Sequence, residues 1–455
     1  MQRKLIEQIT LVASVIKWSI YAAIVGVLVG IGTTVFLKTL AWTSAVVGNY
    51  PGYYYFLPVT LILSSLLVFW LAPEAAGHGT EKVIEAVHKR MGKIPFKVVP
   101  VKLVATVITL ASGGSAGKEG PCAQIGAGLA SAFASLLRLN DVERRKLVIC
   151  GISAGFATVF GTPIAGALFG IEVLVLGQMM YEVLFPSFVS GIVGYHVAIT
   201  LGAQYAHPPV CLPPQVTGLS IAELVLLGIW CGLIALFFIE TMNLAHKYFE
   251  RYLRSKVLQA AVGGLLLILV AELISPIYLG LGLDTLDAGW KGNTLPMAAF
   301  FWKSVATSIT LGCGGSGGVV TAIFFIGTAA GNLFAQLFNP HYIAAFSAIG
   351  MVAVLSGSAN TPIAASVMAI ELFGPGIAAD AALTCMVSFL IVGYRSIYPS
   401  QLLGVLKSES LVVETGMPIG EVDYAAVSHR EKSLVGFIIR VFDRYLNKNG
   451  KPDKE

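Results

Sequence analysis

Long apolar runs, separated by short polar or glycine-rich breaks, dominate the sequence and fall into two sets of seven. The first set lies at about 16–40, 55–73, 96–112, 119–138, 146–161, 163–180 and 183–203, and the second at about 218–241, 258–283, 296–312, 317–338, 342–357, 361–374 and 377–394. Such runs indicate membrane-spanning helices. Those shorter than the ~20 residues needed to cross a bilayer indicate half-helices or tilted pieces buried against protein.

Two sequence blocks recur in the same order about 200 residues apart. GGSAGKEGPCAQIGAG from Gly113 corresponds to GGSGGVVTAIFFIGTA from Gly314, and TPIAGALFGIEV from Thr162 corresponds to TPIAASVMAIEL from Thr361. An odd number of crossings in each half turns the second half over relative to the first. We therefore expect an all-α polytopic membrane protein built from two inverted-topology repeats, whose short, broken helices meet at a mid-membrane site.

Basic residues gather on one side of this expected topology. The inner loops 74–95, 139–145 and 242–257 and the C-terminal tail contain Lys and Arg, whereas the outer loops 41–54 and 204–217 contain neither. This distribution indicates that both termini are cytoplasmic, in a multi-pass protein of the plasma or inner membrane. The expected domains are a cytoplasmic N-terminus 1–15, a first membrane repeat 16–210, a second membrane repeat 211–403 and a short cytoplasmic tail 404–455.

The composition agrees with lipid as the main solvent. Hydrophobic residues make up 56% of the 455 positions and charged residues 12%, against roughly 25% charged in a soluble domain. The net charge of +5 gives no reason to expect a nucleic-acid partner. The six cysteines form no CxxC pair, so we expect no metal site and no cofactor. Five of them lie in apolar stretches and are expected to be buried and reduced, and Cys211 lies in a Pro-rich loop.

The segment from Gly113 to Gly126 carries the most informative chemistry. A helix that starts near Pro121 directs its unpaired N–H groups and its positive end toward the membrane interior, where they favour an anion. The equivalent second-half segment, 317–320, offers backbone amides from the opposite side. Glu119 stands between glycines in an apolar run, and such a carboxylate is costly to place in lipid. It competes with a bound anion when charged and withdraws when protonated, although a helix-start carboxylate that merely satisfies amides is the alternative.

A third glycine-rich break, PEAAGHGT from Pro73, leads into the amphipathic stretch EKVIEAVHKR. His78 in this break is expected either to donate its ring N–H to an anion or to pack at the membrane interface. Glu172 and Glu371, at the ends of the repeated TPIA blocks, are expected to make a buried ion pair or backbone contacts. The segment from Ser433 (SLVGFIIRVFDRYLNK) has an apolar face and is either a helix on the inner membrane surface or a plain surface helix.

Together, these breaks resemble those of the CLC family of chloride channels and chloride/proton exchangers, from the first helix to about Leu403. GKEGP at 117–121 is similar to the family's GREGP, and PEAAGHGT at 73–80 to the segment that carries GSGIP. GSGGVVTA at 315–322 is similar to the GGIFAP region, and SIYPSQLL from Ser396 to the last membrane helix with its central tyrosine.

The resemblance implies a homodimer with one anion pathway in each subunit, and it implies roles for individual residues. Glu119 is the implied gating glutamate, and Tyr398 the hydroxyl donor to a central anion. The implied anion-binding residues are His78, Gly117, Lys118, Glu119, Gly120, Val319, Val320 and Tyr398. Two departures bear on function. His78 replaces the family's coordinating serine, so the resemblance does not determine which anion is preferred. Val173 stands where many exchangers carry an inner proton-transfer glutamate.

These features predict a transporter of chloride or similar small inorganic anions, with protons and membrane lipid as further partners, and not an enzyme. Val173 favours a channel-like mode slightly, and a proton-coupled chloride antiporter is the alternative. Fluoride or nitrate as the transported anion stays open. A rival from another class is an intramembrane serine hydrolase that uses Ser115 or Ser316 with a base such as His78. That rival explains neither the repeated GGS block nor Glu119.

Overall fold

The structure is a computed structural model that describes residues 2–205, 220–422 and 426–427. Its first half consists of α1 (Gln2–Gly48), α2 (Leu57–Leu71), α3 (Thr80–Lys89), α4 (Val98–Ala111), α5 (Glu119–Leu136), α6 (Asp141–Phe160), α7 (Pro163–Glu172) and α8 (Tyr181–Thr200). The second half consists of α9 (Ile221–Tyr252), α10 (Lys256–Leu273), α11 (Leu283–Trp290), α12 (Ala299–Gly312), α13 (Val320–Phe338), α14 (Ile343–Ala359), α15 (Pro362–Phe373) and α16 (Ala378–Val392). Cys211 and the segment from Ser433 lie outside the described residues.

Each of the fourteen predicted apolar runs overlaps one of these helices, so the all-α polytopic fold is confirmed. Two differences concern the loops. The amphipathic helices α3 and α11 are additional, and the predicted run 258–283 is divided by the 3₁₀ turn Pro276–Tyr278 after α10 ends. A proline in that turn supplies no backbone N–H to continue the helix.

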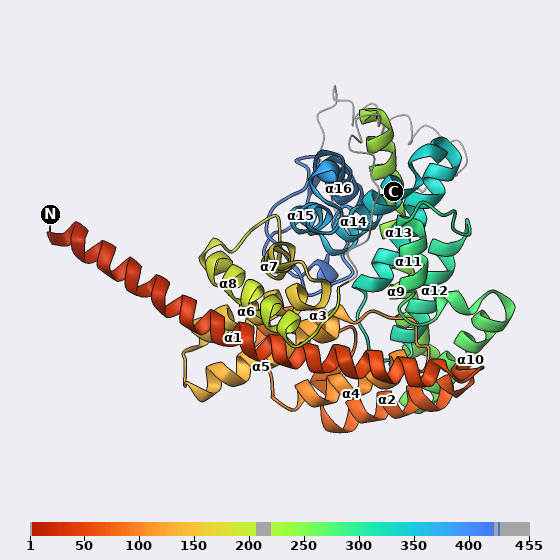
Figure 1. Ribbon diagram of the computed structural model, residues 1–455, viewed down its shortest axis with the longest axis horizontal. Coiled ribbons are helices and arrows are strands. Elements are labelled where there is room, and N and C mark those ends of the chain that lie inside the picture. The colour runs from red at the N-terminus through yellow and green to blue at the C-terminus, as the bar shows by residue number, and fades with distance from the viewer. Residues whose placement is uncertain (1, 206–219, 423–425, 428–455) are drawn as a thin grey trace, which may run out of the picture.

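The first helix is longer than predicted and begins at Gln2 instead of near residue 16. A helix of 47 residues is about 70 Å long at ~1.5 Å per residue, more than twice the thickness of a hydrocarbon core. Its N-terminal part therefore extends away from the rest of the molecule (Figure 1), and residues 3–17 are exposed.

The structure also contains two short two-stranded sheets. β1 (Val175–Leu176) pairs in parallel with β2 (Leu402–Leu403), and β3 (Leu411–Val412) pairs antiparallel with β4 (Ala426–Val427). The first sheet connects the end of α7 to the chain after α16, so it ties the C-terminal segment to the first repeat.

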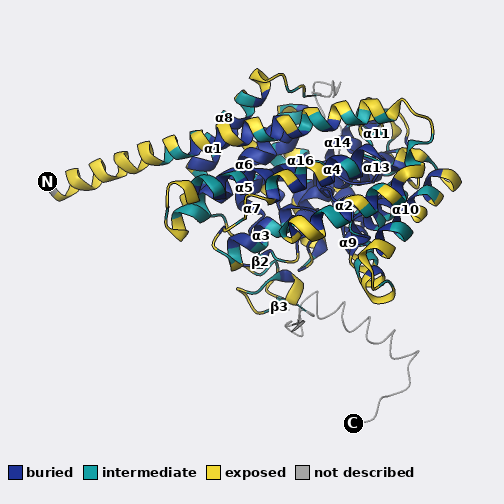
Figure 2. Ribbon diagram, turned by 90° about the horizontal axis from the view of Figure 1, so that it is seen from below, coloured by how far each residue is buried: buried dark blue, intermediate teal, exposed yellow. Residues whose placement is uncertain are grey.

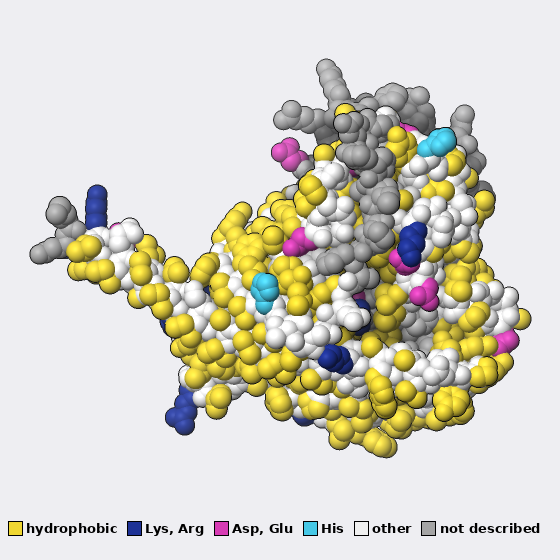
Figure 3. All heavy atoms as spheres, in the orientation of Figure 1, with side chains coloured by type: hydrophobic (Ala, Val, Ile, Leu, Met, Phe, Trp, Pro, Cys, Tyr) yellow, Lys and Arg dark blue, Asp and Glu magenta, His cyan; other side chains and the backbone are white. Residues whose placement is uncertain are grey.

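The helices differ in how far they are buried. Figure 2 shows exposed residues along rim helices such as α1 and α10 and buried residues in the interior. For α13 and α14, 83% and 89% of the most apolar window is buried. Hydrophobic side chains cover most of the face in Figure 3, with few Lys or Arg among them. That surface suits lipid better than water.

Glycine contacts allow the inner helices of each half to pack closely, and the two halves repeat them. An added Cβ at Gly126 in α5 meets the carbonyl oxygen of Gly151 in α6 at 2.3 Å. The second half repeats this between Gly327 in α13 and Gly350 in α14, at 2.5 Å. Small residues at these crossings let the backbones approach, as in other membrane bundles.

The halves contact each other reciprocally. The amide of Gly117 donates to the carbonyl of Gly318 at 2.7 Å, and the amide of Gly318 donates back to Gly117 at 2.6 Å, in an antiparallel bridge. Each contact occurs twice with the repeats exchanged, which is the signature of a two-fold interface. The antiparallel direction agrees with inverted repeats.

Glu172 and Glu371 make the most symmetric of these contacts. Glu172 accepts hydrogen bonds from the amides of Ile363 (3.0 Å) and Ala364 (2.7 Å) at the start of α15. Glu371 accepts from Ile164 and Ala165 at the start of α7, at the same two distances. Each carboxylate thus satisfies two orphan amides and faces the positive end of the other repeat's helix. Of the two expected roles, backbone contact is the one observed.

We predict that Glu172→Gln lowers the thermal unfolding midpoint in detergent more than Glu371→Gln does. A glutamine keeps one acceptor and turns its NH₂ group toward a backbone donor, and such a buried mismatch costs about 1–3 kcal/mol. Glu172 is 6% exposed, whereas Glu371 is half-buried and can reach water. Equal midpoints for the two variants would contradict this assignment.

Candidate anion-binding site

Two broken helices meet head to head at the centre of the candidate site. α5 begins at Glu119, two residues before Pro121, and α13 begins at Val320. The Gly117–Gly318 bridge lies directly before both helix starts. The first-turn amides of a helix have no intrahelical partner, and its dipole is positive at this end. Two such ends at one junction form a site for an anion.

Glycines make this junction possible because three chain segments meet there with no room for side chains. An added Cβ at Gly120 meets the carbonyl oxygen of His78 at 2.0 Å, and one at Gly318 meets the amide nitrogen of Gly120 at 2.7 Å. Gly79 has a φ of +81°, and a Cβ added to it would lie 2.5 Å from the carbonyl oxygen of Gly120. The loop that carries His78 is therefore packed against the start of α5.

The Glu119 side chain crosses from the first repeat to the second. It is 0% exposed, and its Oε2 accepts a hydrogen bond from the amide of Thr321 at 3.0 Å. The Thr321 hydroxyl donates to Oε1. Oε2 also lies over Gly117, at 2.3 Å from the position of an added Cβ. The carboxylate thus occupies the N-terminal turn of α13, where an anion is favoured.

Tyr398 and His78 form another wall of the junction. Tyr398 is 0% exposed and His78 is 7% exposed, and their ring centroids are 5.6 Å apart. Among the described residues, neither the Tyr398 hydroxyl nor His78 Nδ1 has a hydrogen-bond partner, and both atoms are buried. A hydroxyl donates through its O–H, and a neutral imidazole donates through whichever nitrogen holds the proton. Both groups are therefore available to a bound species.

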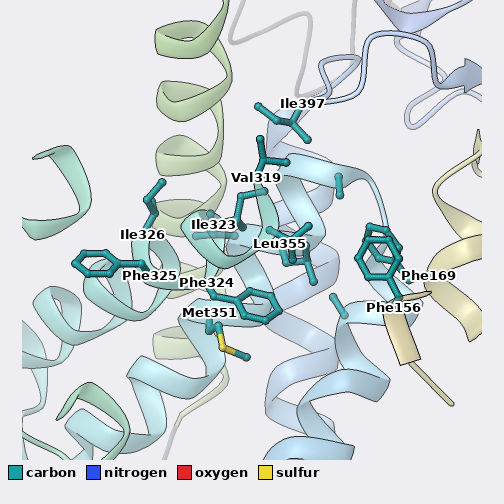
Figure 4. Close-up of a cluster of buried hydrophobic side chains, with 14 of the residues drawn as sticks. Phe156, Phe169, Val319, Ile323, Phe324, Phe325, Ile326, Met351, Leu355 and Ile397 are labelled. Atoms are coloured by element: carbon teal, nitrogen blue, oxygen red, sulfur yellow. The ribbon is translucent and has the colours of Figure 1, made fainter. Parts of the chain in front are cut away.

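The start of α13 is otherwise surrounded by apolar side chains. Val319 and Val320 are 1% and 0% exposed. Figure 4 shows Val319 beside Ile397, the neighbour of Tyr398, with Leu355 and Phe324 further along. Apolar surroundings strengthen electrostatic interactions with the few polar groups present.

The structure thus brings the predicted site residues to one place. Gly117, Gly120, Val319 and Val320 lie at the helix junction, and Glu119, His78 and Tyr398 contact or border it. Lys118 is the N-cap residue of α5, with a partly exposed side chain that acts electrostatically on Glu119. Their roles in binding and gating stay predictions.

Three supporting residues were not identified from the sequence. Lys102 Nζ donates to the carbonyls of Ala75 (3.1 Å) and Gly77 (2.6 Å) and so holds the His78 loop from inside α4. Lys303 in α12 makes the equivalent pair of bonds to Tyr278 (3.2 Å) and Gly280 (2.7 Å). Both lysines are 0% exposed. A lysine at the same place in two apolar runs about 200 residues apart is a signal that a repeat alignment can find.

The third is Thr321, which supplies both bonds to Glu119. Its position directly after Val319 and Val320 marks it as a first-turn residue of α13, but nothing in the local pattern indicates its partner.

The serines of the repeated GGS block have structural partners. Ser115 Oγ lies 3.1 Å from the Thr307 hydroxyl, and Ser316 Oγ lies 3.0 Å from the Thr106 hydroxyl. Their backbone amides donate to Thr310 and Thr109 across the two-fold interface. These bonds account for the GGS repeat as an interface element of the two halves.

The predicted buried cysteines are confirmed for Cys122, Cys150, Cys231, Cys313 and Cys385, all of which are free. Within the residues that the structure describes, no cluster of three or more His, Cys, Asp or Glu side chains is arranged to hold a metal ion.

Comparison with known proteins identifies the family of this chain. The family model "Voltage gated chloride channel" matches residues 59–393. A "Chloride/fluoride channel protein" of Pseudomonas syringae pv. tomato is 35% identical over 407 residues, which cover 88% of this chain and 89% of that protein. An "H(+)/Cl(-) exchange transporter" of Salmonella typhi is 28% identical over 382 residues, which cover 77% of this chain and 80% of that protein.

Solved structures show the same architecture. A CLC-type fluoride/proton antiporter superposes with a TM-score of 0.80 at 28% identity, covering 85% of this chain and 97% of that one. A slow cyanobacterial Cl⁻/H⁺ antiporter superposes with a TM-score of 0.71 at 20% identity, covering 82% and 94%, and supports the fold alone. The family match, the relatives and the shared fold agree with one another, and this chain belongs to the CLC family of voltage-gated chloride channels and anion transporters.

Proposed function

We propose that this protein exchanges fluoride or chloride for protons across the membrane, with Glu119 as the group that both moving ions share. Transport of small anions is the activity of its family. The observation that carries the coupling is the Glu119 carboxylate, which is held by the amide and hydroxyl of Thr321 at the start of α13. The side chain itself is an anion at a position that favours anions.

The coupling follows from this competition. A charged Glu119 and a mobile anion cannot both occupy the same donors, because two negative charges at one buried site repel strongly. Protonation removes the charge and weakens the hold of Thr321 on the carboxylate. The anion then takes the donors, and Glu119 carries the proton. Alternation between these two occupants moves protons and anions in opposite directions.

Observations on both sides bear on the mode of transport. The fluoride/proton antiporter structure and the H(+)/Cl(-) exchange transporter favour exchange, and their printed functions are those of the relatives. Val173, at the position where many family exchangers carry a glutamate, favours a channel, which is the second candidate function. Fluoride stands beside chloride because the 35% identical relative carries both anions in its name.

Further proposals concern assembly and orientation. We propose a homodimer in which each subunit has a complete pathway, since both half-helices and Tyr398 come from one chain. We also propose that both termini face the cytoplasm, as the distribution of Lys and Arg indicates.

A flux measurement separates exchange from conduction. Purified protein is reconstituted into liposomes loaded with fluoride or chloride, the membrane potential is clamped, and an anion electrode and a pH probe record together. We expect an outward anion gradient to drive protons inward against their own gradient. Rapid anion efflux without proton movement would contradict exchange and favour the channel. The ratio of the fluoride and chloride rates gives the preferred anion.

We predict that Glu119→Gln abolishes the pH dependence of anion flux and proton movement, while anion permeation stays intact or increases. A glutamine is a permanent mimic of the protonated carboxyl and does not titrate. Asp287→Asn, which changes an exposed carboxylate on α11 that pairs with Lys291, is the matched control and should leave both fluxes unchanged. An unaltered pH response in Glu119→Gln would show that the role of Glu119 is wrong.

We predict that Tyr398→Phe weakens anion binding, because a buried ion loses one donor worth on the order of 1.5–3 kcal/mol. Isothermal titration of the purified protein with fluoride and chloride measures the change. The control is Tyr394→Phe, whose hydroxyl donates to the carbonyl of Leu411 at 3.1 Å and so has a structural use. Equal anion affinities for wild type and Tyr398→Phe would refute the assignment.

A further inference from the structure

A cluster of polar groups connects the candidate site to the side of the molecule that carries Lys82 and Lys89. Its members are His78 from the loop before α3, Thr80 and Glu81 from the start of α3, and Tyr398 and Ser400 from the segment after α16. We name it the inner polar cluster. The amide of Ser400 donates to Glu81 Oε1 at 3.0 Å, and the Ser400 hydroxyl donates to the same oxygen. The rings of His78 and Tyr398 face each other with centroids 5.6 Å apart.

This cluster contains an unusual number of unpaired buried polar atoms. Among the described residues, fifteen buried side-chain atoms have no hydrogen-bond partner, and four of them lie here: His78 Nδ1, Thr80 Oγ1, Glu81 Oε2 and Tyr398 Oη. An unpaired buried polar group costs about 1–3 kcal/mol, and folded proteins keep few of them. Their concentration along two adjoining segments indicates a path for a mobile polar species.

We infer that Glu81 is a proton-transfer residue between the inner solution and Glu119, an inference that rests on the exchange proposed above. The Glu81 carboxylate takes up one proton from the inner solution and becomes neutral. It then releases that proton through the hydroxyls of the inner polar cluster to the Glu119 carboxylate. Each hydroxyl accepts a proton on a lone pair and passes on its own, so Glu81 returns to its charged form and Glu119 becomes neutral.

The position of Glu81 suits transfer in both directions. Glu81 is partly exposed, but its Oε2 atom is buried. The residue thus lies at the boundary between the solution and the protein interior. Glu119 is 0% exposed and needs an intermediate group to exchange protons with the inner solution. Glu81 and Glu119 both interact electrostatically with the Tyr398 hydroxyl, so that hydroxyl lies within the field of each acid.

The surroundings of Glu81 keep it able to titrate. Burial raises the pKa of its carboxyl above the ordinary value, and the two hydrogen bonds from Ser400 oppose that rise. On its own helix, Lys82 favours the charged form and Glu85 disfavours it. Of the packed segments, the one after α16 contributes the Tyr398 hydroxyl, which interacts electrostatically with Glu81.

A purely structural role is the alternative, in which Glu81 only holds Ser400 and thereby the Tyr398 segment. The two roles separate in the ratio of proton flux to anion flux. Loss of a proton-transfer residue lowers proton flux relative to anion flux, because Glu119 can still gain and lose its proton on the outer side and so let anions pass. Loss of a structural bond disturbs Tyr398 and lowers both fluxes together.

The test uses Glu81→Gln in the full-length protein, reconstituted into liposomes with fluoride and chloride gradients, with anion and proton fluxes recorded together. We expect proton flux to fall about a hundredfold, the size of an ordinary acid–base contribution, while anion flux persists. Glu85→Gln, a carboxylate on the same helix that pairs with Lys82 at the surface, is the matched control and should keep the wild-type ratio.

Two results would overturn the inference. One is that both fluxes in Glu81→Gln equal those of wild type, and the other is that both fluxes fall by the same factor; in either case the proton-to-anion ratio is that of wild type. Failure of the exchange proposal is a different result, because wild type itself would then move no protons.

Ser400→Ala is a second variant that keeps the carboxylate, for use if Glu81→Gln does not fold. It removes a donor to the charged form of Glu81, so the pKa of Glu81 rises further and the midpoint of the proton-flux profile moves to higher pH. Anion flux should not change. An unmoved midpoint in Ser400→Ala would also overturn the inference.

Discussion

The structure depends on the approach of two helix N-termini, those of α5 and α13, to a single junction. Two positive dipole ends and their unpaired amides repel when brought together, and they persist only with negative charge between them. The Glu119 carboxylate supplies that charge from within the chain. The junction thus favours negative charge before any mobile anion enters it, and in the proposed function a mobile anion gains access by replacing Glu119.

The two-fold relation between the halves produces this junction. A single pair of backbone bonds, between Gly117 and Gly318, sets the two helices opposite each other. Equivalent contacts at Glu172 and Glu371 fix α7 and α15 in the same way. Because each contact is made twice, the same sequence pattern allows a broken helix to be buried in both repeats.

Local sequence patterns predicted most of this architecture. Contacts between residues far apart in the sequence could not be predicted from them. Apolar runs, glycine breaks and a carboxylate in an apolar segment are visible within a few residues, so the helices, the repeats and Glu119 could be predicted. The partners of Glu119 and Glu81 lie 202 and 319 residues away, and no nearby pattern marks them. The helices α3 and α11 have ten and eight residues and no long apolar run, so they read as loops.

The two repeats share a scaffold but carry different side chains at equivalent positions, and this difference distinguishes the two sides of the junction. Lys102 and Lys303 hold equivalent loops by the same two carbonyl bonds. The residue after each bonded glycine is His78 in the first half and Leu281 in the second, and the helix-start residues are Glu119 and Val320. At these two pairs of equivalent positions, the titratable side chains thus lie in the first half only. Under the proposed exchange, a symmetric frame with identical groups would offer protons the same route from either side, whereas this arrangement gives the two sides different routes to one carboxylate.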